Sequence, residues 1–284
     1  MKEIINQNFE GERSLFKAED LFISRCNFDN GESPLKHSRD ITAEHSEFRF
    51  KYPFWYSRDI SITDSTFYEM ARAGIWYSED VSVKNSIFIA PKAFRRCKDI
   101  TLENVKFMDA AETLWDCTDV SIRNVEVKGD YFGMNCLEVE ADGLSVDGNY
   151  CFDGARYLTI RNSRLISKDA FWNCESVLCE NCHISGEYLG WNSKEITFIN
   201  CTIESHQGLC FIDGLVLKNC KLVNTDLAFE YSSDIEAELI GSVDSIKNPS
   251  GGVIRCESVV ELILEEDMVD ISKTQIIIGR GAEE

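Results

Sequence analysis

A short phrase recurs along most of the chain: an acidic residue, an aliphatic residue, any residue, a second aliphatic residue, any residue and then asparagine. Examples are DVSVKN at 80–85, DITLEN at 99–104, DVSIRN at 119–124 and EITFIN at 195–200. Alternation of apolar and polar residues with a period of two predicts β-strands. Recurrence of the same phrase at a fixed interval predicts a repeat architecture, in which each repeat buries its apolar face against its neighbours.

The first position of the phrase, which is acidic in most copies, is taken as position zero and sets the period. We place position zero at Asp20, Asp40, Asp59, Asp80, Asp99, Asp119, Asp142, Tyr157, Ser176, Glu195, Gly214, Asp234 and Ser258. Most steps are 19–21 residues, and a step of 23 followed by one of 15 indicates a local slip near Gly143. The sequence therefore predicts about 13 turns of 19–20 residues.

Each turn is expected to contain three strands with inward apolar residues. Positions +1, +3 and +8 carry apolar side chains, and asparagine at +5 suits a corner because it tolerates the left-handed conformation. Position −5 is also large and apolar, at Leu15, Leu35, Phe54, Ile75, Phe94, Leu114, Leu137, Phe152, Phe171, Leu209, Phe229 and Val253. We expect an all-β, right-handed, single-stranded parallel β-helix with three parallel sheets. It should form one domain over residues 1–284, with a cap at 1–14, coils at 15–264 and a C-terminal cap or tail at 265–284.

Four phrases resemble a known family. They are GESPLK at 31–36, AGIWY at 73–77, DAFWN at 169–173 and GEYLGWN at 186–192. In this order they are similar to a bacterial domain-of-unknown-function family with a pectate-lyase-like β-helix. The resemblance implies this fold and carries over no catalytic residue.

The charge of the chain excludes some partners. Its formal net charge is −20 and its pI about 4.6, so it repels phosphate backbones and anionic membranes. We therefore expect no nucleic-acid and no membrane partner. The first residues carry no apolar run typical of a signal peptide, which predicts a cytoplasmic protein whose 12 cysteines are mostly reduced.

All five tryptophans fall on position −4: Trp55, Trp76, Trp115, Trp172 and Trp191. We call this position the Trp row; Phe16 and Lys36 begin it, and Arg95, Glu138 and Asp153 interrupt it. Because −5 points inward, −4 is expected to point outward. Exposed indole rings beside polar groups suit the apolar faces of sugar rings. The alternatives are packing under loops, inside the coil or against a partner subunit.

Charged and amide residues precede this row. Toward the N-terminus they are basic (Lys51, Arg72, Lys92, Arg95 and Arg96), and later they are acidic or amide (Glu112, Asp116, Asp130, Asp169, Glu187, Gln207, Asp226 and Glu230). Our candidate catalytic residues are Asp169, Glu187, Arg95 and Asp116. Candidate substrate-binding residues are the five tryptophans with Lys36, Arg72 and Lys92.

Two kinds of chemistry fit these candidates. Carboxylates on adjacent turns, such as Asp169 with Glu187 or Glu138 with Asp153, have about the 5–5.5 Å separation of retaining glycosidases. A lyase would instead use a base such as Arg72 or Lys92. Chance pairs are also expected in a chain with 49 acidic residues.

The cysteine spacing Cys174-x4-Cys179-x2-Cys182, with Cys201 beyond, resembles an iron–sulfur pattern. Each of these residues also fits an inward slot of the repeat, so we interpret them as small buried apolar residues. No cofactor and no metal are expected.

Three functional hypotheses follow. The first is binding or lyase- or hydrolase-like processing of a saccharide, or of a small acidic or polar ligand, along the Trp row. The second is a non-catalytic scaffold whose Trp row is an interface with a partner or with a second copy in a homo-oligomer. The third is an acidic rod that imitates a nucleic acid. The sequence leaves open whether the protein is an enzyme.

Overall fold

The computed structural model describes residues 2–279. The chain divides into two compact units, Met1–Asp147 (unit 1) and Gly148–Glu284 (unit 2). Both consist of parallel strands, and the helical content of the described residues is one short 3₁₀ turn, η1 (Ile271–Lys273). The right-handed parallel β-helix predicted from the repeat is confirmed.

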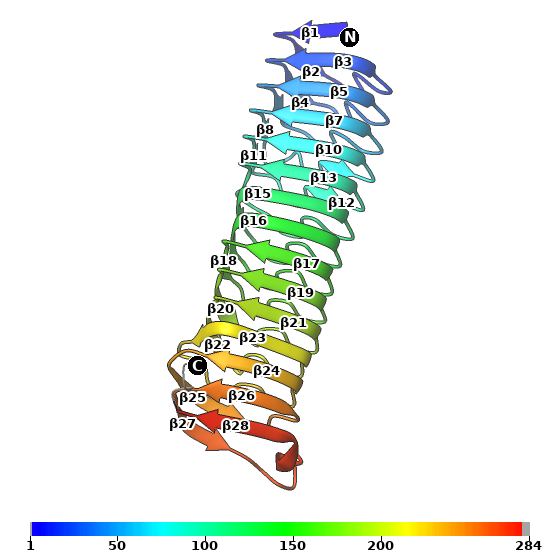
Figure 1. Ribbon diagram of the computed structural model, residues 1–284. Coiled ribbons are helices and arrows are strands. Elements are labelled where there is room, and N and C mark those ends of the chain that lie inside the picture. Colours follow the sequence, from blue (N-terminus) through cyan, green and yellow to red (C-terminus); the bar gives the residue numbers. More distant parts are fainter. Residues whose placement is uncertain (1, 280–284) are drawn as a thin grey trace. The chain divides into compact units, whose positions relative to one another are not determined.

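In unit 1 one strand from each turn stacks in a first face: β1 (Lys2–Ile5), β3 (Glu19–Ser24), β5 (Arg39–Glu44), β7 (Arg58–Thr63), β10 (Glu79–Lys84), β13 (Lys98–Glu103), β15 (Thr118–Lys128) and β16 (Leu137–Asp147). A second face contains β2 (Asn8–Glu10), β4 (Asn27–Asn30), β6 (Glu47–Phe48), β8 (Thr66–Phe67), β11 (Ile87–Phe88), β14 (Lys106–Phe107) and the later parts of β15 and β16. The third face has the short pair β9 (Ile75–Trp76) and β12 (Phe94–Arg95). Figure 1 shows this stacking.

Unit 2 repeats the arrangement. Its first face contains β17 (Arg156–Arg161), β19 (Glu175–Glu180), β21 (Lys194–Ile199), β23 (Asp213–Leu222), β24 (Ser233–Leu239), β26 (Gly252–Cys256) and β28 (Thr274–Ile278). Its other strands are β18 (Arg164–Ile166), β20 (His183–Glu187), β22 (Thr202–His206), and the separate pair β25 (Ser242–Lys247) and β27 (Ser258–Ile263).

Strand register corrects two assignments of position zero. Val120 pairs with Val139, which places position zero of β16 at Glu138 instead of Asp142. The steps around it are then both 19, so there is no slip near Gly143, and Leu137 is 36% exposed instead of filling an inward slot. Likewise Ile235 pairs with Gly252, so Ser258 lies in β27 and Val253 is not at −5.

The number of turns is about 15. The two additional turns begin at β1 and β28, which pair with β3 and β26. Residues 2–5 and 8–10, expected to cap the coil, thus pair with the turn that follows, with a register shift between Phe9 and Glu10. Part of the expected tail, residues 280–284, lies outside the described residues.

The third face is mostly turns because several residues of each repeat have a left-handed backbone. Position −7 is left-handed at Arg13, Ser33, Tyr52, Ala73, Lys92, Glu112 and Tyr131 in unit 1, and at Tyr150, Asp169, Tyr188, Gln207 and Leu227 in unit 2. We call these residues the −7 column. Position −5 is also left-handed at Leu114, Gly133, Phe152, Phe171, Gly190, Leu209 and Phe229. Extended segments between such residues are too short for a continuous third sheet.

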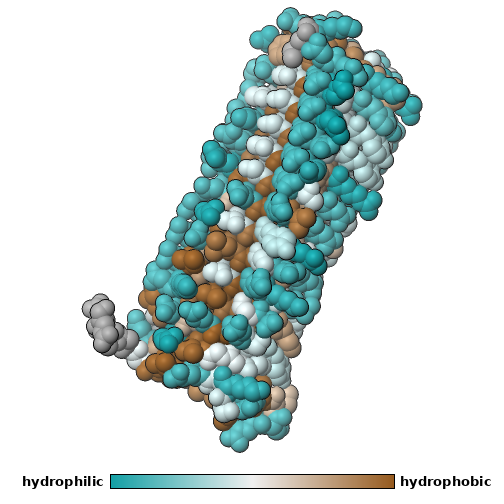
Figure 2. Space-filling view, turned by 45° about the vertical axis from the view of Figure 1, so that its right-hand side comes forward, coloured by the Kyte–Doolittle hydropathy of each residue, from teal (hydrophilic) through white to brown (hydrophobic). Residues whose placement is uncertain are grey.

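Like residues stack along the coil axis. In unit 1 the +8 phenylalanines Phe28, Phe48, Phe67, Phe88 and Phe107 form a ladder with ring centroids 4.3–5.0 Å apart. These rings are nearly fully buried, whereas hydrophilic residues cover much of the visible surface in Figure 2. A stacking distance near the spacing of neighbouring strands lets each ring contact the next.

The predicted asparagine ladder is present in both units. In unit 2 the amide nitrogen of each asparagine donates to the amide oxygen of the one before it, from Asn219 through Asn200 and Asn181 to Asn162, at 2.7–3.4 Å. All four residues have a left-handed backbone. In unit 1 Asn85, Asn104 and Asn124 are linked in the same way.

The 12 cysteines, all within residues 2–279, are buried and free of disulfides. Several thiols donate to backbone carbonyls two residues earlier or on the preceding turn, as Cys201 does to Ile199 and Cys179. Burial raises the pKa of the Cys210 thiol to about 12. These contacts agree with the interpretation of cysteine as a small apolar residue.

Asn200→Ala should destabilise unit 2, because it removes two amide–amide hydrogen bonds and places alanine at a positive φ of 53°. We expect a loss of about 1–2 kcal/mol in the free energy of unfolding. Urea unfolding followed by circular dichroism measures it, and Gln275→Ala, which removes an exposed amide of β28 outside the ladder, is the control. A loss no larger than that of the control would show that the ladder contributes nothing.

The buried thiols should react slowly with a thiol reagent in the folded protein. Full reaction of all 12 is expected only in denaturant, because burial both blocks access and disfavours the thiolate. Counting thiols with and without denaturant tests this. Rapid reaction of most of them under native conditions would contradict the packing.

Candidate functional site

The five tryptophans lie half-buried on the third face, and four of them are fixed by the same hydrogen bond. The indole Nε1 of Trp55, Trp76, Trp115 and Trp172 donates to the backbone oxygen of Ala73, Lys92, Tyr131 and Tyr188, respectively, at 2.6–2.9 Å. These acceptors are the −7 residues of the next turn. The bond fixes one edge of each indole, and its two faces can contact side chains of the adjacent turns or a ligand.

In unit 1 those faces are covered by residues of the Trp row itself. Trp55 and Trp76 stack in parallel with centroids 5.3 Å apart, and the Lys36 ammonium lies 5.6 Å from the centroid of Trp55. The guanidinium of Arg95 lies between Trp76 and Trp115, 4.5 Å from each ring. Cation–π contacts of this kind are favourable, and they cover the indole faces in this part of the row, although the buried Nε atom of Arg95 has no hydrogen-bond partner.

Glu112 completes this arrangement. Its carboxylate is 2.9 Å from both the Arg95 guanidinium and the Lys92 ammonium. Burial opposes ionisation of Glu112, but hydrogen bonds and charge from Lys92 and Arg95 outweigh it and lower its pKa. Arg95 and Lys92, predicted separately for catalysis and for binding, therefore meet at one carboxylate.

The other predicted residues of unit 1 lie apart from this cluster of contacts. Arg72 is exposed, and exposed Asp116 contacts Arg96 at 3.5 Å and accepts from Asn135 at 3.2 Å. The assignment of Glu138 to the Trp row was wrong, because the corrected register places Met134 there. Glu138 instead lies beside Asp119, whose proximity raises the pKa of Glu138. Its proposed partner Asp153 belongs to unit 2.

In unit 2 the aromatic residues line a hollow of about 430 Å³. Its lining residues are Tyr150, Lys168, Asp169, Trp172, Tyr188 and Trp191. The two indoles are tilted by 36° with centroids 6.4 Å apart, in contrast to the close parallel stack of Trp55 and Trp76. Tyr150 and Tyr188 meet the indoles edge-on at 6.3 and 5.7 Å.

Asp169 is the buried polar group of this hollow. It is 2% exposed, and its Oδ1 atom has no hydrogen-bond partner. Burial raises the pKa of Asp169, with smaller contributions in the same direction from Glu187 and Asp153. Lys168 and a hydrogen bond with Tyr150 act in the opposite direction. A buried carboxylate oxygen without a donor is costly, so a ligand group that donates a hydrogen bond to this atom would remove that cost.

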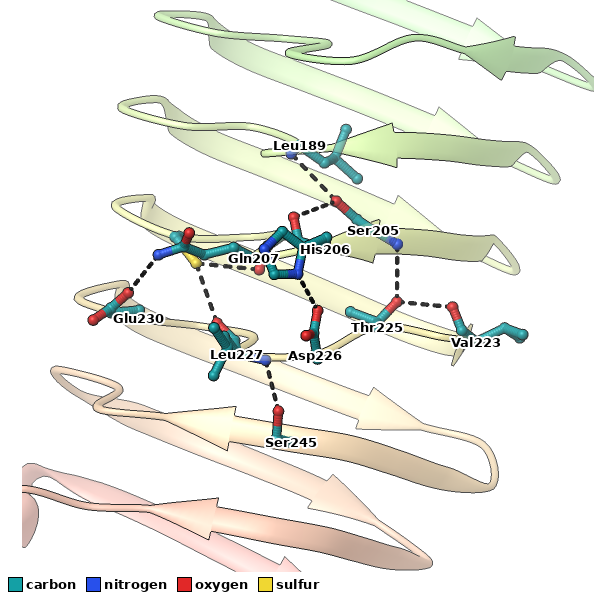
Figure 3. A network of polar contacts seen from close by, with 12 residues as sticks. Leu189, Ser205, His206, Gln207, Val223, Thr225, Asp226, Leu227, Glu230 and Ser245 are labelled. Carbon is teal, nitrogen blue, oxygen red and sulfur yellow. Dashed lines mark hydrogen bonds and ion pairs between the residues drawn. The ribbon is translucent and has the colours of Figure 1, made fainter.

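A column of charged residues borders the hollow. Lys168 and Glu187 form an ion pair at 3.2 Å, and on the next two turns His206 Nδ1 lies 2.7 Å from Asp226. Figure 3 shows the latter pair beside the bond from Gln207 to Glu230. Asp169 and Glu187 thus lie on adjacent turns, joined by a backbone hydrogen bond, but the exposed Glu187 carboxylate is engaged by Lys168.

Sequence reasoning missed Tyr150, Lys168 and Tyr188. Tyr150 and Tyr188 belong to the −7 column, and Lys168 directly precedes one of its members. A left-handed position occupied by tyrosine or aspartate gives little signal in a pattern of apolar residues. The clue that the sequence does offer is spacing: the −7 column always lies three residues before the Trp row, as Asp169 does before Trp172.

The arrangement in unit 2 can bind a ligand that has apolar faces and hydrogen-bonding groups. The rings provide apolar surface, and Asp169 provides one buried polar contact. In the described part of the chain, no helical segment has the length and apolarity needed to cross a membrane.

Comparison with solved structures finds similar folds at low sequence identity. PfbA, a surface adhesin of Streptococcus pneumoniae, is 11% identical over 86% of this chain and 81% of its own, with a TM-score of 0.42. The mannuronan C-5 epimerase AlgE4 A-module of Azotobacter vinelandii is 9% identical over 96% and 87%, with a TM-score of 0.30. The family 28 exopolygalacturonase of Yersinia enterocolitica is 7% identical over 99% and 73%, also with a TM-score of 0.30.

No curated protein matches the chain. Among protein families, the one described as "Protein of unknown function (DUF3737)" matches residues 2–277, which is nearly the whole sequence. The chain therefore belongs to the DUF3737 family.

Proposed function

We propose that the protein binds a saccharide in the hollow of unit 2, between Trp172 and Trp191. The observation that carries this proposal is the combination of four aromatic rings with a buried carboxylate oxygen that has no partner. Sugar rings present C–H faces that pack on indoles, and their hydroxyl groups donate hydrogen bonds to a carboxylate.

Unit 1 supports the choice of unit 2 as the binding site. There Arg95 occupies the space between two indoles, and Trp55 and Trp76 cover each other. Little indole surface is left for a ligand in that stretch. In unit 2 Phe211 lies 4.6 Å from Trp191, but Trp172 and Trp191 are 6.4 Å apart and line a volume large enough for a sugar residue.

The scaffold hypothesis predicts a different effect of removing the indoles of the hollow. If the Trp row were an interface between copies of this chain, removing an indole from the hollow would change the oligomeric state and leave saccharides without effect. Light scattering of the variants described below separates the two hypotheses.

Trp172→Ala should weaken saccharide binding by about 1–3 kcal/mol, the scale of burying a large apolar side chain. The measurement is quenching of intrinsic fluorescence by hexasaccharides of glucose, N-acetylglucosamine, glucosamine and galacturonate. Trp55→Ala is the matched control, because Trp55 lies outside the hollow and stacks on Trp76. If none of the four hexasaccharides changes the fluorescence of the unmodified protein, the proposal is wrong.

Asp169→Asn should make the unliganded protein more stable at neutral pH, by about 1 kcal/mol. Burial raises the folded-state pKa of Asp169 above its unfolded value, so ionisation costs folding free energy as the pH rises above about 4. Below that pH the carboxyl is protonated in both states and the advantage of the variant should fall away. Urea unfolding of both proteins at pH 7 and pH 3.5 tests this, and an equal difference at both values would contradict it.

A further inference from the structure

Two segments of the chain share one local structure. Glu112 and Trp115 in unit 1 occupy the same repeat positions as Asp169 and Trp172 in unit 2. Both acidic residues have a left-handed backbone, with φ of 55° and 56°. Both indoles donate to the backbone of the tyrosine at −7 of the next turn, Tyr131 or Tyr188. The two segments therefore present a carboxylate and an indole in the same way.

They differ in the residue of the Trp row on the preceding turn. In unit 1 this residue is Arg95, which lies on the face of Trp115 and contacts Glu112. In unit 2 it is Asp153, whose short side chain instead accepts a hydrogen bond from Asn173 at 2.9 Å. Arg95, one of the two cations that contact Glu112 in unit 1, has no counterpart at this position in unit 2, and a hollow lies beside Trp172.

The charges around the hollow favour a cation there. Asp153, Asp169 and Glu187 are acidic, and Lys168 is the one basic residue among those that line it. The Lys168 ammonium is 3.2 Å from Glu187 and 5.4 Å from the centroid of the Tyr188 ring, so it is partly neutralised by a carboxylate other than Asp169 and lies on Tyr188 instead of on an indole. Burial raises the pKa of Asp169 in spite of the nearby Lys168, whereas hydrogen bonds and charge from Lys92, and then from Arg95, lower that of Glu112.

We infer that the ligand of the hollow carries a cationic group that takes the place held by Arg95 in unit 1: the ligand is a saccharide with free amino groups. The ammonium would donate to the unpartnered oxygen of Asp169 and lie against the face of Trp172, while the sugar ring packs on Trp191. This inference rests on the proposed function and adds the class of sugar to it. Neutral, N-acetylated and acidic sugars lack the charge that the site requires.

The first test compares four hexasaccharides by fluorescence titration of the full chain. The glucosamine hexamer should bind at least about tenfold more tightly than the glucose and N-acetylglucosamine hexamers, and the galacturonate hexamer more weakly still. Asp169→Asn should abolish this preference. Glu236→Gln makes the same charge change at an exposed position of β24 and should preserve it.

The second test supplies the missing cation from the chain itself. Asp153→Arg should place a guanidinium against Trp172, as Arg95 lies against Trp115. It should raise the thermal midpoint relative to Asp153→Asn and weaken binding of the glucosamine hexamer by about tenfold or more. Asp153→Asn removes the same negative charge without adding a cation and should keep most of the binding.

The outcomes separate the inference from the proposed function. Equal binding of the glucose and glucosamine hexamers would overturn the inference and leave saccharide binding in place. Failure of all four hexamers would overturn the proposed function and this inference with it. If Asp153→Arg neither stabilises the protein nor weakens binding relative to Asp153→Asn, the equivalence with Arg95 is wrong. A preference for glucosamine that survives Asp169→Asn would reflect the overall negative charge instead of this site.

Discussion

The rest of the structure depends on contact between equivalent residues of successive turns. Parallel pairing brings each residue beside the one at the same position of the neighbouring turn, as Val83 lies between Ile62 and Leu102. Each position of the repeat must therefore hold a residue type that can pack against an equivalent residue at about the 4.8 Å spacing of paired strands. Phenylalanine stacks, asparagine amides that donate and accept, and small thiols all meet that requirement.

Carboxylates and tryptophans meet it less well, and their surroundings differ along the chain. The acidic residues at position zero face solvent, and slight burial together with repulsion from Asp59 and Asp99 raises the pKa of Asp80. In unit 1 the Trp row contains a cation between two rings: the guanidinium of Arg95 lies on the faces of both Trp76 and Trp115. In unit 2 the rings at Trp172 and Trp191 have no such cation between them. The candidate site thus lies where residues of the Trp row on adjacent turns no longer cover each other's faces.

Much of the fold could be predicted because its signal is local and repeated. The alternation at 80–85 and its copies define strands, spacing and inward residues without any coordinates. The prediction failed at 138–143, where Glu138 begins a phrase whose second inward residue is the small Ala141 and whose asparagine is replaced by Gly143. Gly143 takes the left-handed corner, where a Cβ atom would lie 2.7 Å from the side-chain oxygen of Asn124. The nearby Asp142 was mistaken for position zero.

The candidate site was predictable only in part. The Trp row and Asp169 follow from counting positions, but the sequence treats Trp76 and Trp172 alike. What separates them is which side chain lies on the adjacent turn, how it is oriented and which carboxylate it reaches. The exposed fraction of 2% at Asp169 and its unpartnered oxygen depend on the left-handed backbone of the −7 column, which no apolar pattern reveals.

Oxidative footprinting of individual tryptophans, read by mass spectrometry, tests the central claim most directly. The indoles of Trp172 and Trp191 should oxidise faster than those of Trp76 and Trp115, since Arg95 covers the latter pair. A bound amino-sugar oligomer should then protect Trp172 and Trp191 and leave Trp76 and Trp115 unchanged. Uniform oxidation of all four, or protection confined to Trp76 and Trp115, would contradict the account.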